Sequence, residues 1–136
     1  MPQMIFLNLP VKDLPASMAF FRALGFSFNP QFTDDTAACM VISDTIFAML
    51  LTHEKFAGFS PKPIADTERS IEVLTCLSRE SREAVDAIVK AAVAAGGSTY
   101  REPQDHGFMY GHGFRDLDGH VWEAVWMDPA AVAGGA

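Results

Sequence analysis

The stretch MIFLNLPVKDLPASMAFFRALG, residues 4–25, predicts a β-strand followed by a helix. The first six residues are mostly apolar and end before a proline, as a short strand does. Asp13 then stands one residue before Leu14-Pro15, which is typical of a helix N-cap followed by proline in the first turn. Apolar residues recur at helical spacing up to Gly25, where we expect the helix to end.

The segments that follow predict three more strands, and the second half of the chain repeats the whole order. The strands are expected around Phe26 to Phe32, in ACMVIS (38–43) and in IFAMLL (46–51). In the second half, IEVLTCL (71–77) precedes an amphipathic helix that ends at Gly96-Gly97, and strands follow at 99–101, 108–115 and 120–127. We therefore predict an α+β protein of two tandem βαβββ modules.

The module boundaries follow from the order of the predicted strands and helices. We place module one at about 1–52, a connector at about 53–69, module two at about 70–128, and a frayed tail at 129–136. A chain of 136 residues has the length of a single domain.

Composition excludes several classes of protein. The net charge of −7 does not suit a nucleic-acid backbone, and no apolar run approaches the roughly 20 residues of a membrane span. The first residues lack the features of a secretory signal, and Cys39 and Cys76 stand alone, so we expect a cytoplasmic protein. Phe supplies eleven of the aromatic residues, an excess that belongs either to the core or to an apolar pocket.

Two motifs resemble a known superfamily. NLPVKDLPASMAFFRALGF (8–26) and GFRDLDGHVWEAVW (113–126) are similar to the opening and closing segments of the vicinal oxygen chelate superfamily. That superfamily contains glyoxalase I, bleomycin-resistance proteins and extradiol dioxygenases, and the chain looks closest to glyoxalase-like proteins often labelled lactoylglutathione lyases. The resemblance implies one domain whose two modules form a curved mixed sheet around a cavity, with the helices outside. It also implies a homodimer.

The resemblance implies a divalent metal as well, but the residues at the ligand positions disfavour it. Carried over by position, the ligands fall on Phe6, Met49, Glu72 and Glu123. A phenyl ring donates nothing, and a thioether is a poor partner for hard or borderline cations. We therefore expect no metal cofactor; if one binds, Glu72 and Glu123 would hold it, with Asn8 as an additional donor.

Glu72 and Glu123 stand between apolar neighbours and need an explanation. If their strands pair as the resemblance implies, the two carboxylates face each other, share a proton and act as a catalytic base or ligand anchor. The alternative is that each glutamate meets an arginine or reaches solvent.

The strand alternation assigns a ligand-binding wall. We expect Val121 and Val125 to face the cavity beside Glu123, while Trp122 and Trp126 pack under the helix. The remaining predicted ligand-binding residues lie on the other strands: Phe6, Asn8, Phe47, Met49, Leu74, Phe108 and Tyr110. His120 follows a glycine and is interpreted as a turn residue.

Three functional hypotheses remain open. The first is a metal-free small-molecule binding protein of the bleomycin-resistance type, with an aromatic or amphipathic ligand in an apolar cavity. The second is a glyoxalase-like lyase or isomerase with an atypical metal site, and the third is a structural homodimer with a vestigial pocket.

Overall fold

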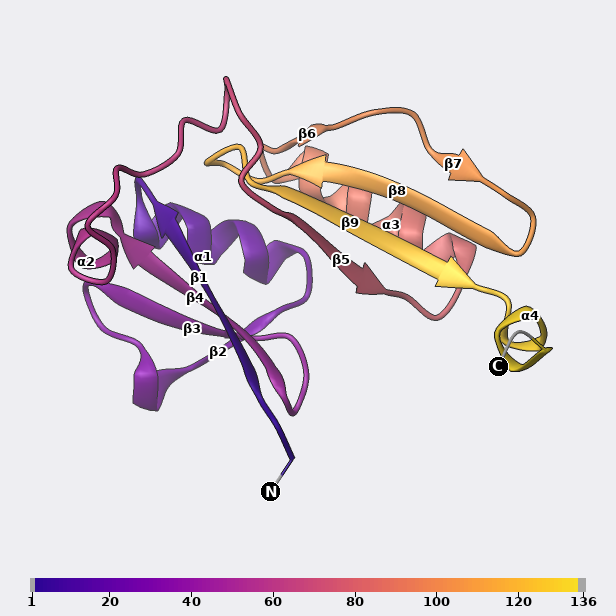
Figure 1. Ribbon diagram of the computed structural model, residues 1–136, viewed down its shortest axis with the longest axis horizontal. Coiled ribbons are helices and arrows are strands. Elements are labelled where there is room, and N and C mark those ends of the chain that lie inside the picture. Colours follow the sequence, from indigo (N-terminus) through magenta and orange to yellow (C-terminus); the bar gives the residue numbers. More distant parts are fainter. Residues whose placement is uncertain (1, 135–136) are drawn as a thin grey trace. The chain divides into compact units, whose positions relative to one another are not determined.

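The computed structural model describes residues 2–134 and has α+β architecture with two mixed sheets. The chain divides into two compact units, Met1–Asp66 (unit 1) and Thr67–Ala136 (unit 2). Each unit contains one sheet, and a helix packs on one face of that sheet (Figure 1). Within residues 2–134, no helix has both the length and the apolar composition needed to cross a membrane.

Unit 1 begins with the predicted strand and helix. Asp13 caps the helix by accepting a hydrogen bond from the Ala16 amide at 3.1 Å, and Gly25, with φ of +102°, turns the chain toward the next strand. The sheet order is β1-β4-β3-β2, in which β1 pairs with β4 in parallel and the other pairs are antiparallel. The elements are β1 (Ile5–Val11), α1 (Leu14–Ala23), β2 (Ser27–Asn29), a 3-10 turn (Pro30–Phe32), β3 (Ala37–Val41), β4 (Ile46–Thr52) and α2 (His53–Ala57).

The core of unit 1 lies between α1 and the sheet. Phe20 and Phe21 on α1 are buried and meet edge to face at 5.0 Å, and the sheet contributes the buried side chains of Met40 and Leu50. The expectation that these two phenylalanines pack between helix and sheet is confirmed. The opposite face of this sheet is therefore the one left to form a cavity.

Unit 2 repeats this arrangement with a longer hairpin. Ser81 caps the helix by accepting from the Ala84 amide at 3.0 Å, and Gly96 ends it with φ of +109°. The sheet order is β5-β9-β8-β6, and a short β7 also pairs with β8. The elements are β5 (Leu74–Ser78), α3 (Arg82–Ala94), β6 (Ser98–Thr99), β7 (Gln104–Asp105), β8 (Met109–Arg115), β9 (Val121–Met127) and α4 (Pro129–Gly134).

The core of unit 2 forms where α3 covers the β8–β9 hairpin. The apolar stripe of the helix, with Val85, Ile88, Val89 and Ala92, is buried, as are Trp122 and Phe114 on the sheet. Trp122 therefore lies under the helix as expected. Trp126 is half-buried, and the guanidinium of Arg82 lies 5.1 Å from its ring centroid.

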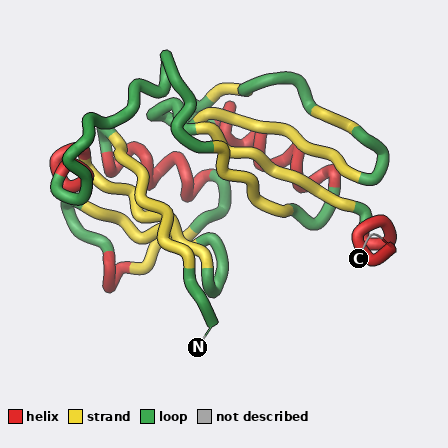
Figure 2. The backbone as a smooth tube through the Cα atoms, viewed as in Figure 1, coloured by secondary structure: helices red, strands yellow, loops and turns green. Residues whose placement is uncertain are grey.

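Two expectations about element bounds were wrong, those for the start of the fifth strand and for the tail. The fifth strand begins at Leu74, so residues 71–73 are not in the sheet. The connector opens with helix α2, although the segment from Gly58 to Val73 has neither helix nor strand (Figure 2). The tail is helical from Pro129 to Gly134 rather than frayed, because the Asp128 carboxylate caps it by accepting from the Ala130 amide at 2.9 Å. The last two residues of the predicted tail lie outside the described residues.

Candidate functional site

The exposed side of the unit 1 sheet carries an apolar cavity of about 390 Å³. The parallel register of β1 and β4 places Phe6 opposite Phe47 and Asn8 opposite Met49. Residues two apart on a strand share a face, so this register gathers the predicted residues of unit 1 on one side. The cavity is lined by Phe6, Asn8, Phe32, Ala37, Cys39, Met49, Leu51, Lys55 and Phe59. We call it the unit 1 cavity.

Phe6 forms an aromatic wall of the unit 1 cavity. Its ring stacks on that of Phe47, with centroids 5.1 Å apart and planes 12° apart, and 52% of the residue remains exposed. Phe47 does not line the cavity itself but supports the ring that does. Stacked aromatic pairs contribute about 0.5–1.5 kcal/mol beyond burial, so Phe47 stabilises this position of the Phe6 ring.

The polar groups of the unit 1 cavity are few. They are the Asn8 amide, the Lys55 ammonium and the Cys39 thiol. Burial raises the pKa of the Cys39 thiol, which therefore stays neutral at physiological pH.

Unit 2 has a separate cavity of about 280 Å³ with more polar walls. Parallel pairing of β5 with β9 places Cys76 opposite Glu123, and β8 places Gly113 on the other side of Glu123. Glu123 and Val125 line this cavity, together with His106 and His112. Val121, which was also expected to face a cavity, is buried and does not line this one. Burial, followed by the charge of Glu123, raises the pKa of the Cys76 thiol.

Glu72 and Glu123 do not form the predicted facing pair. Because β5 begins at Leu74, Glu72 precedes the sheet. In the register of β5 with β9, the residue opposite Glu123 is Cys76. The Glu72 carboxylate lies 3.0 Å from Nδ1 of His120. The alternative prediction gave Glu72 an arginine partner, but its partner in the structure is His120.

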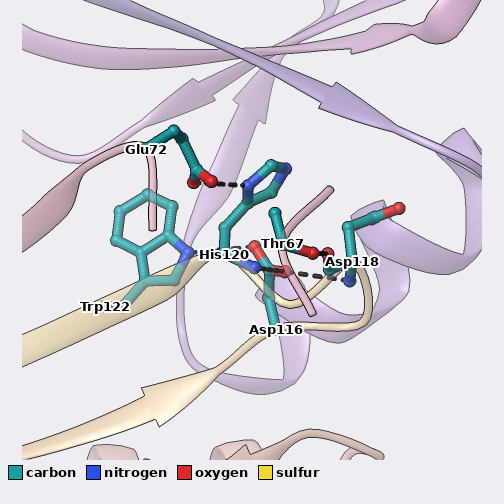
Figure 3. A network of polar contacts seen from close by, with 6 residues as sticks. All are labelled: Thr67, Glu72, Asp116, Asp118, His120 and Trp122. Carbon is teal, nitrogen blue, oxygen red and sulfur yellow. Dashed lines mark hydrogen bonds and ion pairs between the residues drawn. The ribbon is translucent and has the colours of Figure 1, made fainter. Parts of the chain in front are cut away.

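His120 belongs to a buried polar network within unit 2 (Figure 3). Asp116 organises the β8–β9 turn: its Oδ1 accepts from the amides of Asp118 at 2.9 Å and His120 at 3.0 Å. Its Oδ2 accepts from Nε1 of Trp122 at 3.0 Å. Thr67, which lies outside the turn in the sequence, donates a hydrogen bond from its hydroxyl to the Asp118 carbonyl at 2.6 Å.

Burial dominates the electrostatics of this network. Desolvation raises the pKa of Asp116, although the charge of His120 and the three donated hydrogen bonds act in the opposite direction. His120 is 3% exposed, so the interpretation of it as a simple turn residue was incomplete. The sequence places Glu72 48 residues away from His120, and no spacing rule connects residues so far apart.

The structure separates the remaining predicted ligand-binding residues from both cavities. Tyr110 lies on the helix side of β8, where its hydroxyl donates to the Asp86 carboxylate at 2.6 Å. The prediction that Tyr110 lines a cavity was therefore wrong, because the face it shares with Phe114 packs under α3. Leu74 and Phe108 are exposed and line neither cavity.

The residues at the four implied metal-ligand positions do not fit a divalent metal. Phe6 stacks on Phe47, Met49 offers a thioether, and Glu72 is engaged with His120. Glu123, the other carboxylate of the set, neighbours the Cys76 thiol, whose pKa is raised. Across residues 2–134, no group of three or more His, Cys, Asp or Glu side chains is arranged to hold a metal ion.

Comparisons with known proteins agree with this architecture. Residues 3–43 match the family model described as bleomycin resistance protein-like N-terminal. A hypothetical protein from S. aureus is 32% identical, covers 93% of this chain and 95% of its own, and superposes with a TM-score of 0.78. A glyoxalase/bleomycin resistance protein/dioxygenase family enzyme from Burkholderia phytofirmans covers 93% of this chain and 99% of its own at 20% identity, with a TM-score of 0.76. The chain belongs to the vicinal oxygen chelate superfamily.

Other vicinal oxygen chelate relatives extend the range of functions on this fold. A genomically encoded fosfomycin resistance protein from Listeria monocytogenes is 19% identical, covers 93% of this chain and 91% of its own, and has a TM-score of 0.65. No protein of curated function matches the sequence significantly. At this identity the similarity shows a shared fold, while the activity has to be argued from the residues of the site.

Proposed function

We propose that the protein is a metal-free small-molecule binding protein that holds an aromatic or amphipathic compound in the unit 1 cavity. The observation that carries this proposal is the identity of the side chains on the paired strands β1 and β4. Phe6 and Met49 stand where the superfamily's enzymes are expected to hold a metal, and both line an apolar cavity. An apolar wall at that place favours binding of a ring system over metal chemistry.

The physical properties of the cavity support a ligand of modest size. Its volume of about 390 Å³ falls within the roughly 300–1,000 Å³ of small-molecule pockets. Apolar side chains with a few polar groups are typical of such pockets, and the Asn8 amide supplies a group that can orient a ligand. Met49 adds a flexible thioether that adapts to ligand shape.

The test measures metal content and ligand binding on the same preparation. For protein purified without chelator, we expect bound divalent metal far below one equivalent by elemental analysis. We expect N-phenyl-1-naphthylamine, a neutral aromatic probe, to bind with enhanced fluorescence. Phe6→Ala should weaken binding by about tenfold, because it removes the stacked wall.

Phe108→Ala is the matched control for Phe6→Ala. Both residues are phenylalanines of similar exposure, 52% and 54%, but Phe108 lines neither cavity. We expect the control to leave probe binding within about twofold of the wild type. One equivalent of metal that Glu123→Ala abolishes would contradict the proposal and favour the lyase hypothesis. Equal effects of the two Phe variants would also contradict it.

A further inference from the structure

We propose that Lys55 makes the unit 1 cavity selective for amphipathic anions, compounds with an apolar ring-bearing body and a single negatively charged group. This inference rests on the proposed function, which concerns the same cavity. It adds the charge of the ligand, which the apolar walls alone do not determine.

Lys55 is held at the cavity by the local structure of α2. Its backbone amide donates to Oγ1 of Thr52, the last residue of β4, at 3.2 Å. Its carbonyl accepts from the Gly58 amide at 3.1 Å. These bonds attach the short helix directly to the strand that carries Met49, so the lysine stem starts from a defined point beside the cavity.

The ammonium group of Lys55 lies over one aromatic ring of the cavity. Its Nζ lies 5.8 Å from the centroid of the Phe59 ring, a cation–π distance. Lys55 is the charged residue among those that line the cavity. Among the residues that the structure describes, no ion pair joins Lys55 to a carboxylate.

The charge of Lys55 acts on Asp34, whose carboxylate already accepts several hydrogen bonds. Oδ1 of Asp34 accepts from the Thr36 amide at 2.8 Å, the Thr36 hydroxyl at 2.9 Å and the Ala37 amide at 3.1 Å. These bonds, more than the charge of Lys55, hold the pKa of Asp34 below its usual value. Glu54 lies on the neighbouring depression that Lys55 also lines. The ammonium group thus keeps capacity for a ligand anion.

The aromatic rings that line the unit 1 cavity supply the surface for the apolar body of the ligand. Phe6, Phe32 and Phe59 all line the cavity, and Phe32 and Phe59 are 60% and 64% exposed. An apolar body that covers these rings removes them from water and lowers the local dielectric, which strengthens attraction between the ammonium and an anion. In a chain of net charge −7, a local cation offsets the repulsion that an anionic ligand meets.

The experiment compares two probes that share one ring system. The anion 8-anilinonaphthalene-1-sulfonate is N-phenyl-1-naphthylamine with an added sulfonate. Lys55→Met should weaken binding of the sulfonate by about tenfold relative to any change in binding of the neutral amine, because only the sulfonate loses an attraction between opposite charges. Lys55→Arg should retain most of the sulfonate affinity. Added salt should weaken sulfonate binding in the wild type more than in Lys55→Met.

Lys62→Met is the matched control because it removes the same charge in the same unit from a residue outside the cavity lining. We expect it to leave both affinities within about twofold of the wild type. If Lys55→Met and Lys62→Met have the same effect on the sulfonate, the inference is overturned. The proposed function then still stands, provided that Phe6→Ala weakens the neutral probe. If neither probe binds the wild type, both proposals fail.

Discussion

Replacement of Gly119 by alanine should destabilise unit 2 through a specific contact with Thr67. Gly119 adopts φ of +80° in the turn between β8 and β9. A Cβ atom at this position would lie 2.5 Å from Oγ1 and 3.2 Å from Cβ of Thr67. Thr67 cannot easily move away, because its side chain is β-branched and its hydroxyl donates to the Asp118 carbonyl at 2.6 Å.

The expected magnitude has two parts. Placing alanine in the left-handed region costs about 1–2 kcal/mol. Displacing Thr67 loses one hydrogen bond, which contributes about 0.5–1.5 kcal/mol. Gly119→Ala should therefore lower the free energy of unfolding of unit 2 by about 1.5–3.5 kcal/mol.

Gly107→Ala separates these two parts. Gly107 has φ of +81°, nearly that of Gly119, but an added Cβ there would meet nothing within 4 Å. It should show the backbone cost alone, about 1–2 kcal/mol. The assay is urea unfolding followed by tryptophan fluorescence, which reports on unit 2 because Trp122 and Trp126 are the two tryptophans of the chain.

Thr67→Ala tests the assigned contact directly. In that background the hydroxyl is absent, so the cost of Gly119→Ala should fall toward that of Gly107→Ala. Equal losses for Gly119→Ala and Gly107→Ala in the wild-type background would refute the reasoning. A Gly119→Ala penalty that is unchanged by Thr67→Ala would refute it as well.

Two further predictions concern the titratable groups of unit 2. Iodoacetamide at pH 8 should alkylate Cys76 but not the buried Cys39 of the folded protein. Glu123→Gln should increase the rate at Cys76, because loss of the carboxylate charge lowers the thiol pKa; a slower rate on mass spectrometry would contradict this. Burial raises the pKa of Asp116 above its ordinary 3.8, so the folded state holds this proton more tightly than the unfolded state. Relative to Asp116→Asn, wild-type unfolding free energy should therefore increase as pH falls toward 3.8 and decrease as pH rises through the folded-state pKa; urea titrations with no such divergence would disprove it.

The elements set by local chemistry could be predicted from the sequence. Asp13 marks a helix start, and Gly25 and Gly96 mark helix ends, because each satisfies or releases backbone groups within a few residues. The alternation along residues 121–127 likewise placed Glu123 in a cavity and Trp122 under the helix.

The site residues that depend on distant partners could not be predicted in this way. The facing pair of Glu72 and Glu123 required a strand start at Ile71, and alternation does not show where a strand begins to pair. The contact of Glu72 with His120 depends on the path of residues 71–73, which precede β5 and lie outside the sheet. The capping of α4 by Asp128 before Pro129, by contrast, is a local signal that the sequence contains.

The parallel strand pairs determine when each sheet can form during synthesis. Ile5 pairs with Ile46, and Leu74 pairs with Val121. The first strand of each unit is therefore separated from its parallel partner by about 40 or more residues of chain. No pairing among residues 2–134 joins a strand of one unit to a strand of the other. The sheet of unit 1 can therefore form once Thr52 has left the ribosome, before β5 emerges from it. Until then the strand that carries Phe6 is an unpaired apolar segment, the stage at which a nascent chain is most exposed to aggregation.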